Sequence, residues 1–444
     1  MKKMTSTIKP SEFKKRRAMV LKAIGKGGAV ILPAAQQLIR NNDAEFAYRQ
    51  NSNFYYLTGF NEPDAVLVLI PGRQQGEFVL FCQDRDPAME IWTGKRAGQK
   101  GVVEDWGVDQ SFSILKIDQE LPALLEGVRT VHSPIGSDAI FDQQMFGWVN
   151  QLRQQSRRGK QAPVEFIDLG LILNEMRLFK SRAEISAMRR AATITAQAHI
   201  HAMQHTRPGM MEYEVQAETE YCFRKSACVP SYTSIVGGGE NACVLHYIEN
   251  DCELNDGELL LMDAGAEFEL YAADITRTWP VNGKFSEAQS ALYKIVLDAQ
   301  RAAIKQVKPG KSWNAIHTTA VRVITKGLIA IGLLKGKLES LLKDQAYKKF
   351  YMHGTGHWLG MDVHDVGQYK IKDKWRLLEP GMVLTVEPGL YIPAGSRGVA
   401  KKWWNIGIRI EDDVLVTTEG CDVLSKELVK DVEGIESLVG SAFK

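Results

Sequence analysis

The chain has 444 residues, of which 45% are hydrophobic and 24% charged, and its formal net charge is +2. This composition is ordinary for a globular protein of two or three domains, and the balanced charge argues against nucleic acid or an anionic membrane as a partner. No apolar run reaches the length of a membrane span, so we expect no crossing of a membrane.

The N-terminal segment and the cysteines both favour a cytoplasmic location. The basic start "MKKMTSTIKPSEFKKRR" is followed by a stretch broken by lysines and glycines, which predicts that it is not a secretion signal. The six cysteines are scattered without metal-type spacing, which is typical of reduced thiols and not of a disulfide framework.

The first part of the chain mixes strands and helices. Segments 65–72 ("AVLVLIPG") and 76–82 ("GEFVLFC") are rich in strand-forming residues and are separated by turn residues, so they predict neighbouring strands. Segments 121–128 and 144–158 have the pattern of helices. We interpret residues 1–173 as one α/β domain.

A long helix opens the second part. Ser181 is a suitable N-cap, and Glu184 stands three places later, which is the spacing of a capping box. Apolar residues then recur with helical period up to the turn "TRPG" at 206–209. We interpret residues 174–444 as the second domain.

This second domain contains a faint internal repeat. A later helix ends in "VKPG" at 307–310, as the first ends in "TRPG", and "DGELLLMDAG" (256–265) resembles "PGMVLTVEPG" (380–389). If a pseudo-two-fold axis relates the two halves, Asp263 and Glu387 lie at equivalent strand ends and meet near the axis. The alternative is a chance likeness between two glycine-bounded strands.

Two further strands carry acids. The chain can turn back at Glu269 and Leu270, and such a hairpin brings Asp274 close to Asp263. Two acids that face each other among apolar strands repel, and a bound cation would remove that repulsion.

Segment 405–416 ("NIGIRIEDDVLV") predicts a strand with isoleucines on one face and Arg409 and Glu411 on the other. A solvent-exposed Arg–Glu pair is the simple interpretation of that second face. A central strand, which the apolar run "VLV" favours, would instead bury both side chains.

The histidine-rich segment 353–365 ("HGTGHWLGMDVHD") does not form a helical zinc-protease motif. His353 and His357 have the i, i+4 spacing, but glycine and not glutamate follows His353, and three glycines within seven positions disfavour a helix. One histidine of this segment joined to the four strand acids would make an oxygen-rich site. Such a site suits two divalent ions, with Mn, Co, Fe and Zn as candidates.

The motifs together resemble the pita-bread metallopeptidases, the family of methionine aminopeptidase, prolidase and aminopeptidase P. The resemblance covers nearly the whole chain and is most specific to the aminopeptidase P group. It implies an N-terminal creatinase-like α/β domain and a C-terminal α+β pita-bread domain with pseudo-two-fold symmetry. The segments that carry it are 48–69 ("YRQNSNFYYLTGFNEPDAVLVL"), 90–99 ("EIWTGKRAGQ"), 174–181 ("NEMRLFKS"), 230–247 ("PSYTSIVGGGENACVLHY"), 274–285 ("DITRTWPVNGKF") and 357–367 ("HWLGMDVHDVG").

The resemblance implies a metal ligand set. Asp263 would bind one ion, His357 the other, and Asp274, Glu387 and Glu411 would be shared. Family membership favours Mn as the metal.

It also implies roles around the substrate. His353, Tyr391 and Arg409 would surround the proline ring, and His364 and His246 would approach the scissile carbonyl from two sides. Trp92 would reach a neighbouring subunit's active site, which implies a dimer or tetramer.

The implied activity is hydrolysis of the N-terminal Xaa-Pro bond by a hydroxide that bridges the two metals, with Glu387 transferring the proton. The partners would be peptides with proline in the second position. A prolidase that cleaves only Xaa-Pro dipeptides is the close alternative. A pita-bread protein that has lost catalysis and serves as a scaffold is the distant one.

Overall fold

A computed structural model describes residues 6–443 of the chain, which divide into two compact units. The N-terminal unit is Ile8–Met176, and the C-terminal unit begins at Arg177, runs to the last described residue and also includes Thr7. The division falls inside helix α7 (Gly170–Leu178), the same helix in which the predicted boundary at 173/174 lies.

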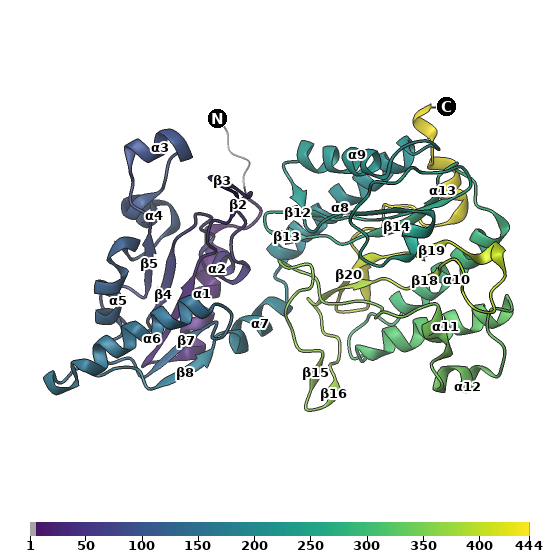
Figure 1. Ribbon diagram of the computed structural model, residues 1–444. Helices are drawn as coiled ribbons and strands as arrows, with labels where there is room; N and C mark the ends of the chain where they lie inside the picture. The colour runs from purple at the N-terminus through teal and green to yellow at the C-terminus, as the bar shows by residue number, and fades with distance from the viewer. Residues whose placement is uncertain (1–5, 444) are drawn as a thin grey trace. The chain divides into compact units, whose positions relative to one another are not determined.

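The N-terminal unit is built on one six-stranded sheet (Figure 1). Its central strand β1 pairs antiparallel with β4 and parallel with β7, so the sheet is mixed. The predicted neighbouring strands are β4 and β5, which pair antiparallel along their whole length. In sheet order the strands are β6 (Gln110–Ser113), β5 (Phe78–Cys82), β4 (Val66–Leu69), β1 (Gly28–Pro33), β7 (Thr130–Ser133) and β8 (Glu165–Asp168).

Helices cover this sheet. The predicted helical segments form α5 and α6, whose Leu121, Met145 and Trp148 pack against the buried side chains of the sheet. The helices of the unit are α1 (Pro10–Ile24), α2 (Ser52–Thr58), α3 (Pro87–Thr93), α4 (Gly98–Trp106), α5 (Ile117–Leu124) and α6 (Ala139–Gln154).

Two helix pairs flank the strands of the C-terminal unit, as Figure 1 shows. Helix α8 begins with the predicted capping box of Ser181 and Glu184, and α10 begins with an equivalent box of Ser286 and Gln289. The helices are α8 (Arg182–His205), α9 (Glu212–Lys225), α10 (Glu287–Ile304), α11 (Asn314–Ala330), α12 (Leu338–Lys343) and α13 (Val432–Leu438).

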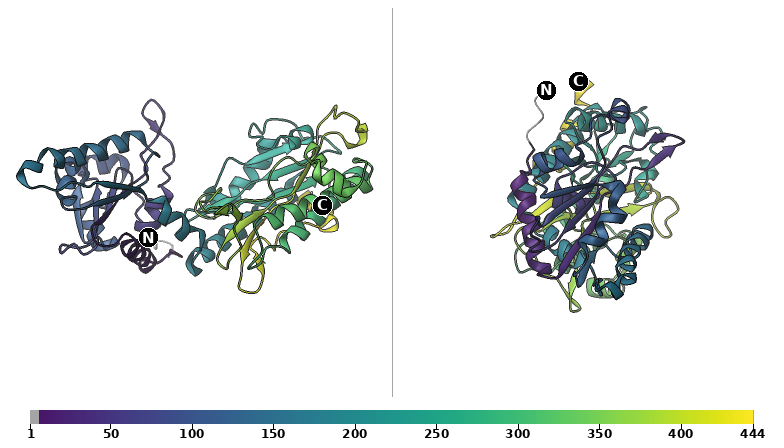
Figure 2. Two further views of the ribbon diagram at one scale, coloured as in Figure 1. Left: turned by 90° about the horizontal axis from the view of Figure 1, so that it is seen from below. Right: turned by 90° about the vertical axis from the view of Figure 1, so that its left-hand side faces the viewer.

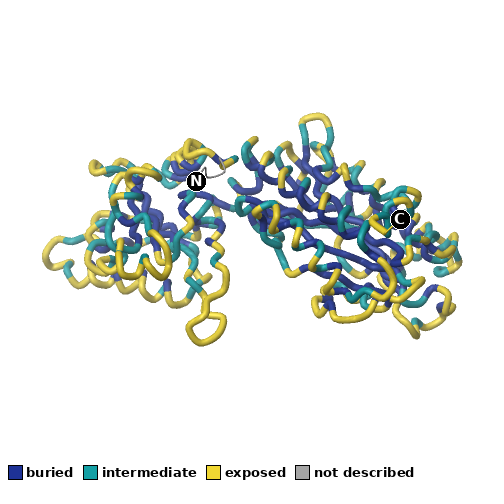
Figure 3. Tube along the Cα trace, turned by 90° about the horizontal axis from the view of Figure 1, so that it is seen from above, coloured by how far each residue is buried: buried dark blue, intermediate teal, exposed yellow. Residues whose placement is uncertain are grey.

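The strands of this unit form small sheets, and the residues of β11, β14, β17 and β20 are all buried, whereas the β15–β16 hairpin is exposed. Figure 3 shows the buried residues concentrated in the interior of each unit and the exposed ones in the loops. The strands are β9 (Val229–Pro230), β10 (Ile235–Gly238), β11 (Leu259–Asp263), β12 (Ala266–Phe268), β13 (Tyr271–Ala272), β14 (Thr276–Pro280), β15 (Lys370–Ile371), β16 (Lys374–Trp375), β17 (Val383–Val386), β18 (Gly389–Ile392), β19 (Ile406–Arg409), β20 (Asp412–Val416) and β21 (Cys421–Val423).

The internal repeat is visible in the hydrogen bonds that follow each helix. The Gly209 amide donates to the Leu254 carbonyl at 2.8 Å, and the Gly310 amide donates to the Leu378 carbonyl at 2.9 Å. Each pair is followed by the same isolated bridge, between 211 and 253 in one half and between 312 and 377 in the other. Both glycines have positive φ, the backbone conformation that favours this residue type. The two halves therefore use the same chain path.

The predicted hairpin between Asp263 and Asp274 is present. Strands β12 and β13 pair around Glu269 and Leu270, which both have positive φ, as a two-residue hairpin turn of this type requires. Beside it, β11 pairs with β14 so that Asp263 lies opposite Thr276.

One predicted strand is interrupted. Segment 405–416 forms β19 and β20 in two different sheets, with a break at Ile410 and Glu411. The break lets β19 pair with β18 and β20 pair with β17, and Figure 2 shows the yellow strands of this region inside the unit. Arg409 and Glu411 are both buried, so the exposed-pair interpretation is wrong.

The structure also bears on the cysteines and on membrane-spanning segments. All six cysteines are free thiols. No helix within residues 6–443 combines the length and the apolar character needed to cross a membrane.

Candidate metal centre

Five side chains predicted as metal ligands converge in the C-terminal unit. They line one cavity of about 300 Å³ together with histidine side chains. Four of them lie at or beside strand ends, and His357 lies in the irregular segment before β15. Asp263 ends β11, Asp274 precedes β14, Glu387 follows β17, and Glu411 lies between β19 and β20.

Asp263 and Asp274 share one hydrogen-bond donor. The Tyr232 hydroxyl lies 2.5 Å from Asp263 Oδ1 and 2.7 Å from Asp274 Oδ1. The second oxygen of Asp263 accepts from Arg409 Nη2 at 2.7 Å, and the second oxygen of Asp274 lies 3.3 Å from His357 Nε2. Both carboxylates are thereby fixed in orientation.

Glu411 and Glu387 have fewer protein partners. Glu411 Oε2 accepts from the Thr276 hydroxyl at 2.6 Å. Glu387 lies 3.8 Å from His357 Nε2 and 3.6 Å from His353 Nδ1, both beyond hydrogen-bond distance.

His357 presents Nε2 to the acids. Its Nδ1 lies 3.0 Å from the Trp358 carbonyl oxygen, and because a carbonyl only accepts, Nδ1 carries the hydrogen. In the neutral ring Nε2 then holds the lone pair, as metal-ligating histidines require. The loop is irregular and not helical, which agrees with the exclusion of a helical zinc-protease motif.

The electrostatics of the cavity favour a bound cation. Burial, and then the neighbouring acids, raise the pKa of Glu411 well above its ordinary value, and burial raises the pKa of Glu387 to about 7. Burial lowers the pKa of His357, but Asp274 and Glu387 outweigh it and raise that pKa to about 9. In the metal-free protein His357 therefore carries a proton on Nε2, the atom that would bind the metal.

The ligand atoms have a spacing that fits a metal. One ligand atom each of Asp274, His357 and Glu411 lie within 4.8 Å of one another. Four carboxylates and one imidazole form an oxygen-rich donor set that suits divalent ions. The residues present therefore fit the divalent metal ions that the sequence predicts.

The predicted substrate residues surround the same cavity. His353, His246, His364 and Arg409 line it. His353 Nδ1 bonds with the Gly354 carbonyl and so carries the hydrogen, and Nε2 therefore accepts from the Tyr391 hydroxyl at 2.9 Å. The same hydroxyl accepts from Arg409 Nη1 at 3.1 Å. Burial, followed by the charge of Arg409, lowers the pKa of His353 to about 3, so this imidazole is neutral. Burial and then His357 lower the pKa of His364.

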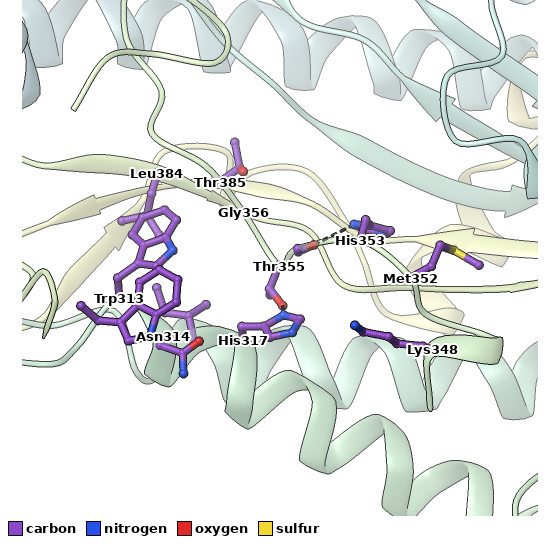
Figure 4. A pocket seen from close by; sticks show the side chains of 13 residues that line it. Trp313, Asn314, His317, Lys348, Met352, His353, Thr355, Gly356, Leu384 and Thr385 are labelled. Carbon is purple, nitrogen blue, oxygen red and sulfur yellow. Dashed lines mark hydrogen bonds between the residues drawn. The ribbon is translucent and has the colours of Figure 1, made fainter. Parts of the chain in front are cut away.

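A second cavity of about 350 Å³ lies along the segment that carries His353 (Figure 4). Thr355 of that segment bonds with His317 Nδ1 at 2.8 Å and with the Tyr351 hydroxyl at 2.6 Å. Figure 4 shows His317 directed at Thr355, with Lys348 and Trp313 on either side. These contacts fix the backbone between His353 and His357 on the side that faces the second cavity.

Trp92 is in the other unit, at the end of α3, where it is 84% exposed. Its predicted role toward a neighbouring subunit stays a prediction. Asp362 and Asp365, which we did not place among the ligands, both form ion pairs with Arg177.

Sequence reasoning missed two residues of the centre. Tyr232 lies in the segment "PSYTS", and nothing local to that segment shows that its hydroxyl points at two distant acids. Asp413 is fully buried and accepts from the Asp274 amide at 3.3 Å, and its only sequence signal is the run "EDD".

Comparisons with known proteins agree on one family. Residues 186–418 match metallopeptidase family M24, and residues 13–132 match the N-terminal domain of aminopeptidase P. The chain is 46% identical to the Xaa-Pro aminopeptidase of Escherichia coli over 99% of its own length and 100% of the relative's. It is 33% identical to human Xaa-Pro aminopeptidase 3, covering 94% of this chain and 82% of that protein.

Solved structures give the same result. The aminopeptidase PepP of Pseudomonas aeruginosa superposes with a TM-score of 0.98 at 51% identity, over 99% of this chain and 100% of that one. A zinc-substituted Escherichia coli aminopeptidase P in complex with product has a TM-score of 0.96 at 45% identity, with 99% and 100% covered. The predicted two-domain fold with a pita-bread C-terminal domain is confirmed.

Proposed function

The chain belongs to metallopeptidase family M24 and carries the aminopeptidase P N-terminal domain, and on that premise we propose that it hydrolyses the first peptide bond of peptides with proline in the second position. The observation that carries the proposal is the convergence of Asp263, Asp274, His357, Glu387 and Glu411 in one buried cavity. The relative at 46% identity over the whole chain has the activity proposed here in its name.

The five residues would hold two divalent ions, with Asp263 on one, His357 on the other, and the remaining three acids shared. Bound there, the ions would lower the pKa of a coordinated water and so supply a hydroxide nucleophile at neutral pH. We propose Mn as the metal, with Co, Zn and Fe as alternatives that the same donors accommodate.

The residues of the chain supply proton transfer and orientation. Glu387 lies beyond hydrogen-bond distance of His353 and His357, so its carboxylate is available to accept a proton from the attacking water. It would then pass that proton to the leaving nitrogen. The nitrogen of an Xaa-Pro bond bears no hydrogen, so protonation is needed for proline to leave.

The histidines would bind the carbonyl and the proline ring. His364 and His246 line the cavity, and neutral imidazoles there can donate to the oxygen that gains charge. The bonded set of His353, Tyr391 and Arg409 forms a buried wall suited to the proline ring. The substrate's free amine would be held among the acids, which limits cleavage to the first bond.

We propose a homo-oligomer, a dimer or tetramer, in which Trp92 reaches a neighbouring subunit. Helix α3 buries none of its residues in the monomer, and Ile91 and Trp92 are 83% and 84% exposed. Exposed aromatic side chains of this kind are enriched at interfaces. We further propose a cytoplasmic location, because all six cysteines are free thiols.

The test measures hydrolysis of Ala-Pro-Ala and of Ala-Pro by protein from which a chelator has removed all metal. The rates are measured before and after addition of Mn, with Co and Zn in parallel. Release of Ala from the tripeptide only when metal is present supports the proposal. Cleavage of the dipeptide alone would reassign the chain as a prolidase. Inactivity with every metal would leave the scaffold interpretation.

A further inference from the structure

A second cluster of metal-binding side chains lies on helices α8 and α9, outside the cavity described above. It consists of His201, His205 and Glu218, and one ligand atom of each lies within 4.8 Å of the others. From this geometry we infer a second metal site, which binds one borderline first-row divalent ion such as Zn²⁺, Ni²⁺ or Cu²⁺.

The two histidines are presented by one helix. They stand four residues apart in the last turn of α8 (Arg182–His205), so they project from the same face, and their ring centroids are 4.1 Å apart. Glu218 is on α9 (Glu212–Lys225), and Figure 1 shows α9 beside α8. A helical His-x-x-x-His pair with a carboxylate from a second helix is a compact chelating set for such ions.

A hydrogen bond of His205 identifies the ring nitrogen that is available to a metal. His205 Nδ1 lies 2.8 Å from the His201 carbonyl oxygen, which can only accept. Nδ1 therefore carries the hydrogen and Nε2 of the neutral ring holds the lone pair.

Across the helices, His201 Nε2 lies 2.7 Å from Glu218 Oε2. In the metal-free protein one proton occupies this contact. A metal would take the place of that proton and release it, and the two atoms would separate to about 3.3 Å, the spacing of ligands in a tetrahedral site with bonds near 2 Å.

Accessibility is suitable for an ion that retains a water. The side chains of His201 and Glu218 are 27% and 38% exposed. Three protein ligands with a solvent-facing fourth position match the coordination number of zinc. The bound ion would link α8 to α9 at the His201–Glu218 contact.

A different cluster shows what a purely structural arrangement looks like. Glu212, Asp251 and Cys252 also lie within metal-binding range. The Glu212 carboxylate, however, already accepts from the amides of Gly238 and Cys252 and from Asn241 and Tyr247. A metal there would have to displace four hydrogen bonds, whereas at His201 it displaces one proton.

The test uses electron paramagnetic resonance of the metal-free full-length protein titrated with Cu²⁺ alone. We expect a signal split by two imidazole nitrogens in the wild type. The predicted ligand set of the large cavity contains one imidazole, His357, so copper bound by that set shows splitting from one nitrogen only. The number of nitrogens that split the signal therefore distinguishes the two sites. This measurement does not depend on the proposed hydrolytic activity.

Variants decide the assignment. His205→Ala should lose the two-nitrogen signal, and Glu218→Gln should keep it with affinity weakened at least about tenfold. Glu220→Gln, on the same helix, is the matched control and should bind as the wild type does. Circular dichroism verifies that each variant is folded. A two-nitrogen signal that persists in His205→Ala, or that is missing from the wild type, would overturn the inference.

Discussion

Glu411 and Asp412 are neighbours in the chain and both are fully buried, yet their surroundings are opposite. Asp412 accepts from Arg277, Ser425 and Gln300 and pairs with Lys430. Burial alone would raise its pKa, but Arg277 and Lys430 outweigh burial and hold that pKa below the ordinary range. Glu411 faces three other acids, and burial followed by their charges raises its pKa well above the ordinary range.

The surroundings of the two carboxylates distinguish an acid that stabilises the fold from an acid that can bind a metal ion. Where the protein supplies its own cations, a buried carboxylate is ionised and stabilises the fold. The four carboxylates around the cavity have Arg409 and His357 as cationic partners, so their remaining negative charge needs a bound cation. Four predictions test this distinction.

The largest expected effect is on catalysis. Glu387→Ala removes the proposed proton carrier, and we expect hydrolysis of Ala-Pro-Ala to fall by about 10³- to 10⁴-fold. The free energy of unfolding of the metal-free variant should not fall, because the variant loses an acid without a protein cation of its own. Steady-state rates and urea melts measure the two effects, and unchanged hydrolysis would contradict the proposed mechanism.

Next is the structural ion pair. Arg277→Met leaves the buried Asp412 with Lys430 as its cationic partner, and we expect the free energy of unfolding to fall by about 3–5 kcal/mol. Lys430→Met is the milder companion, since the Lys430 side chain is partly exposed. Urea unfolding of both checks the order, and a loss from Arg277→Met no larger than that from Lys430→Met would contradict it.

A smaller effect concerns the residue that sequence analysis missed. Tyr232→Phe removes the hydroxyl that orients both Asp263 and Asp274, and we expect metal affinity to fall about 10- to 100-fold. Activity should recover at high Mn concentration, because the ligands themselves remain. Tyr213→Phe, an exposed tyrosine on α9, is the control. A loss that excess metal does not restore would show that Tyr232 acts on substrate instead.

The smallest effect is on the pH dependence of stability. Without metal, the folded protein retains protons on Glu387 and Glu411 that the unfolded chain has lost above its ordinary glutamate pKa of about 4.3. The contribution of these two acids to the free energy of unfolding should therefore fall as pH rises from there through about 7, the folded pKa of Glu387. Bound metal replaces these protons, so saturation with Mn should flatten the slope over the same window.

Asp412 should act with the opposite sign. Its pKa is depressed in the folded state, so its contribution is present at neutral pH and is lost as pH falls through the acid range below the ordinary aspartate value. Thermal melts of metal-free and loaded protein across both windows distinguish the two acids. A stability difference between the loaded and the metal-free protein that stays constant between about pH 5 and about pH 7 would contradict the assignment of unbalanced acids.

Much of the fold was predictable because local patterns carry it. The capping box at Ser181, the hairpin at Glu269 and Leu270 and the pairing of β4 with β5 follow from turn chemistry and side-chain alternation over a few residues. The glycines of 353–365 correctly excluded a helix. The likeness between the strand ends at Asp263 and Glu387 identified the repeat.

Other features depend on contacts between distant segments. The break between β19 and β20 is invisible in the alternating pattern of 405–416, because it arises from pairing with β18 and β17. The bridging hydroxyl of Tyr232 is likewise decided by its position in space.

The sequence by itself determined which residue types the chain offers for metal binding and which strands present them, since side-chain period and turn residues are local properties. Only the tertiary structure decided which buried acids are paired and which are not. Glu411 and Asp412 have the same sequence context, but adjacent side chains along the chain point in different directions. The charges that each then meets come from Arg277, Lys430, Asp274 and Glu387, and only the fold brings these residues together.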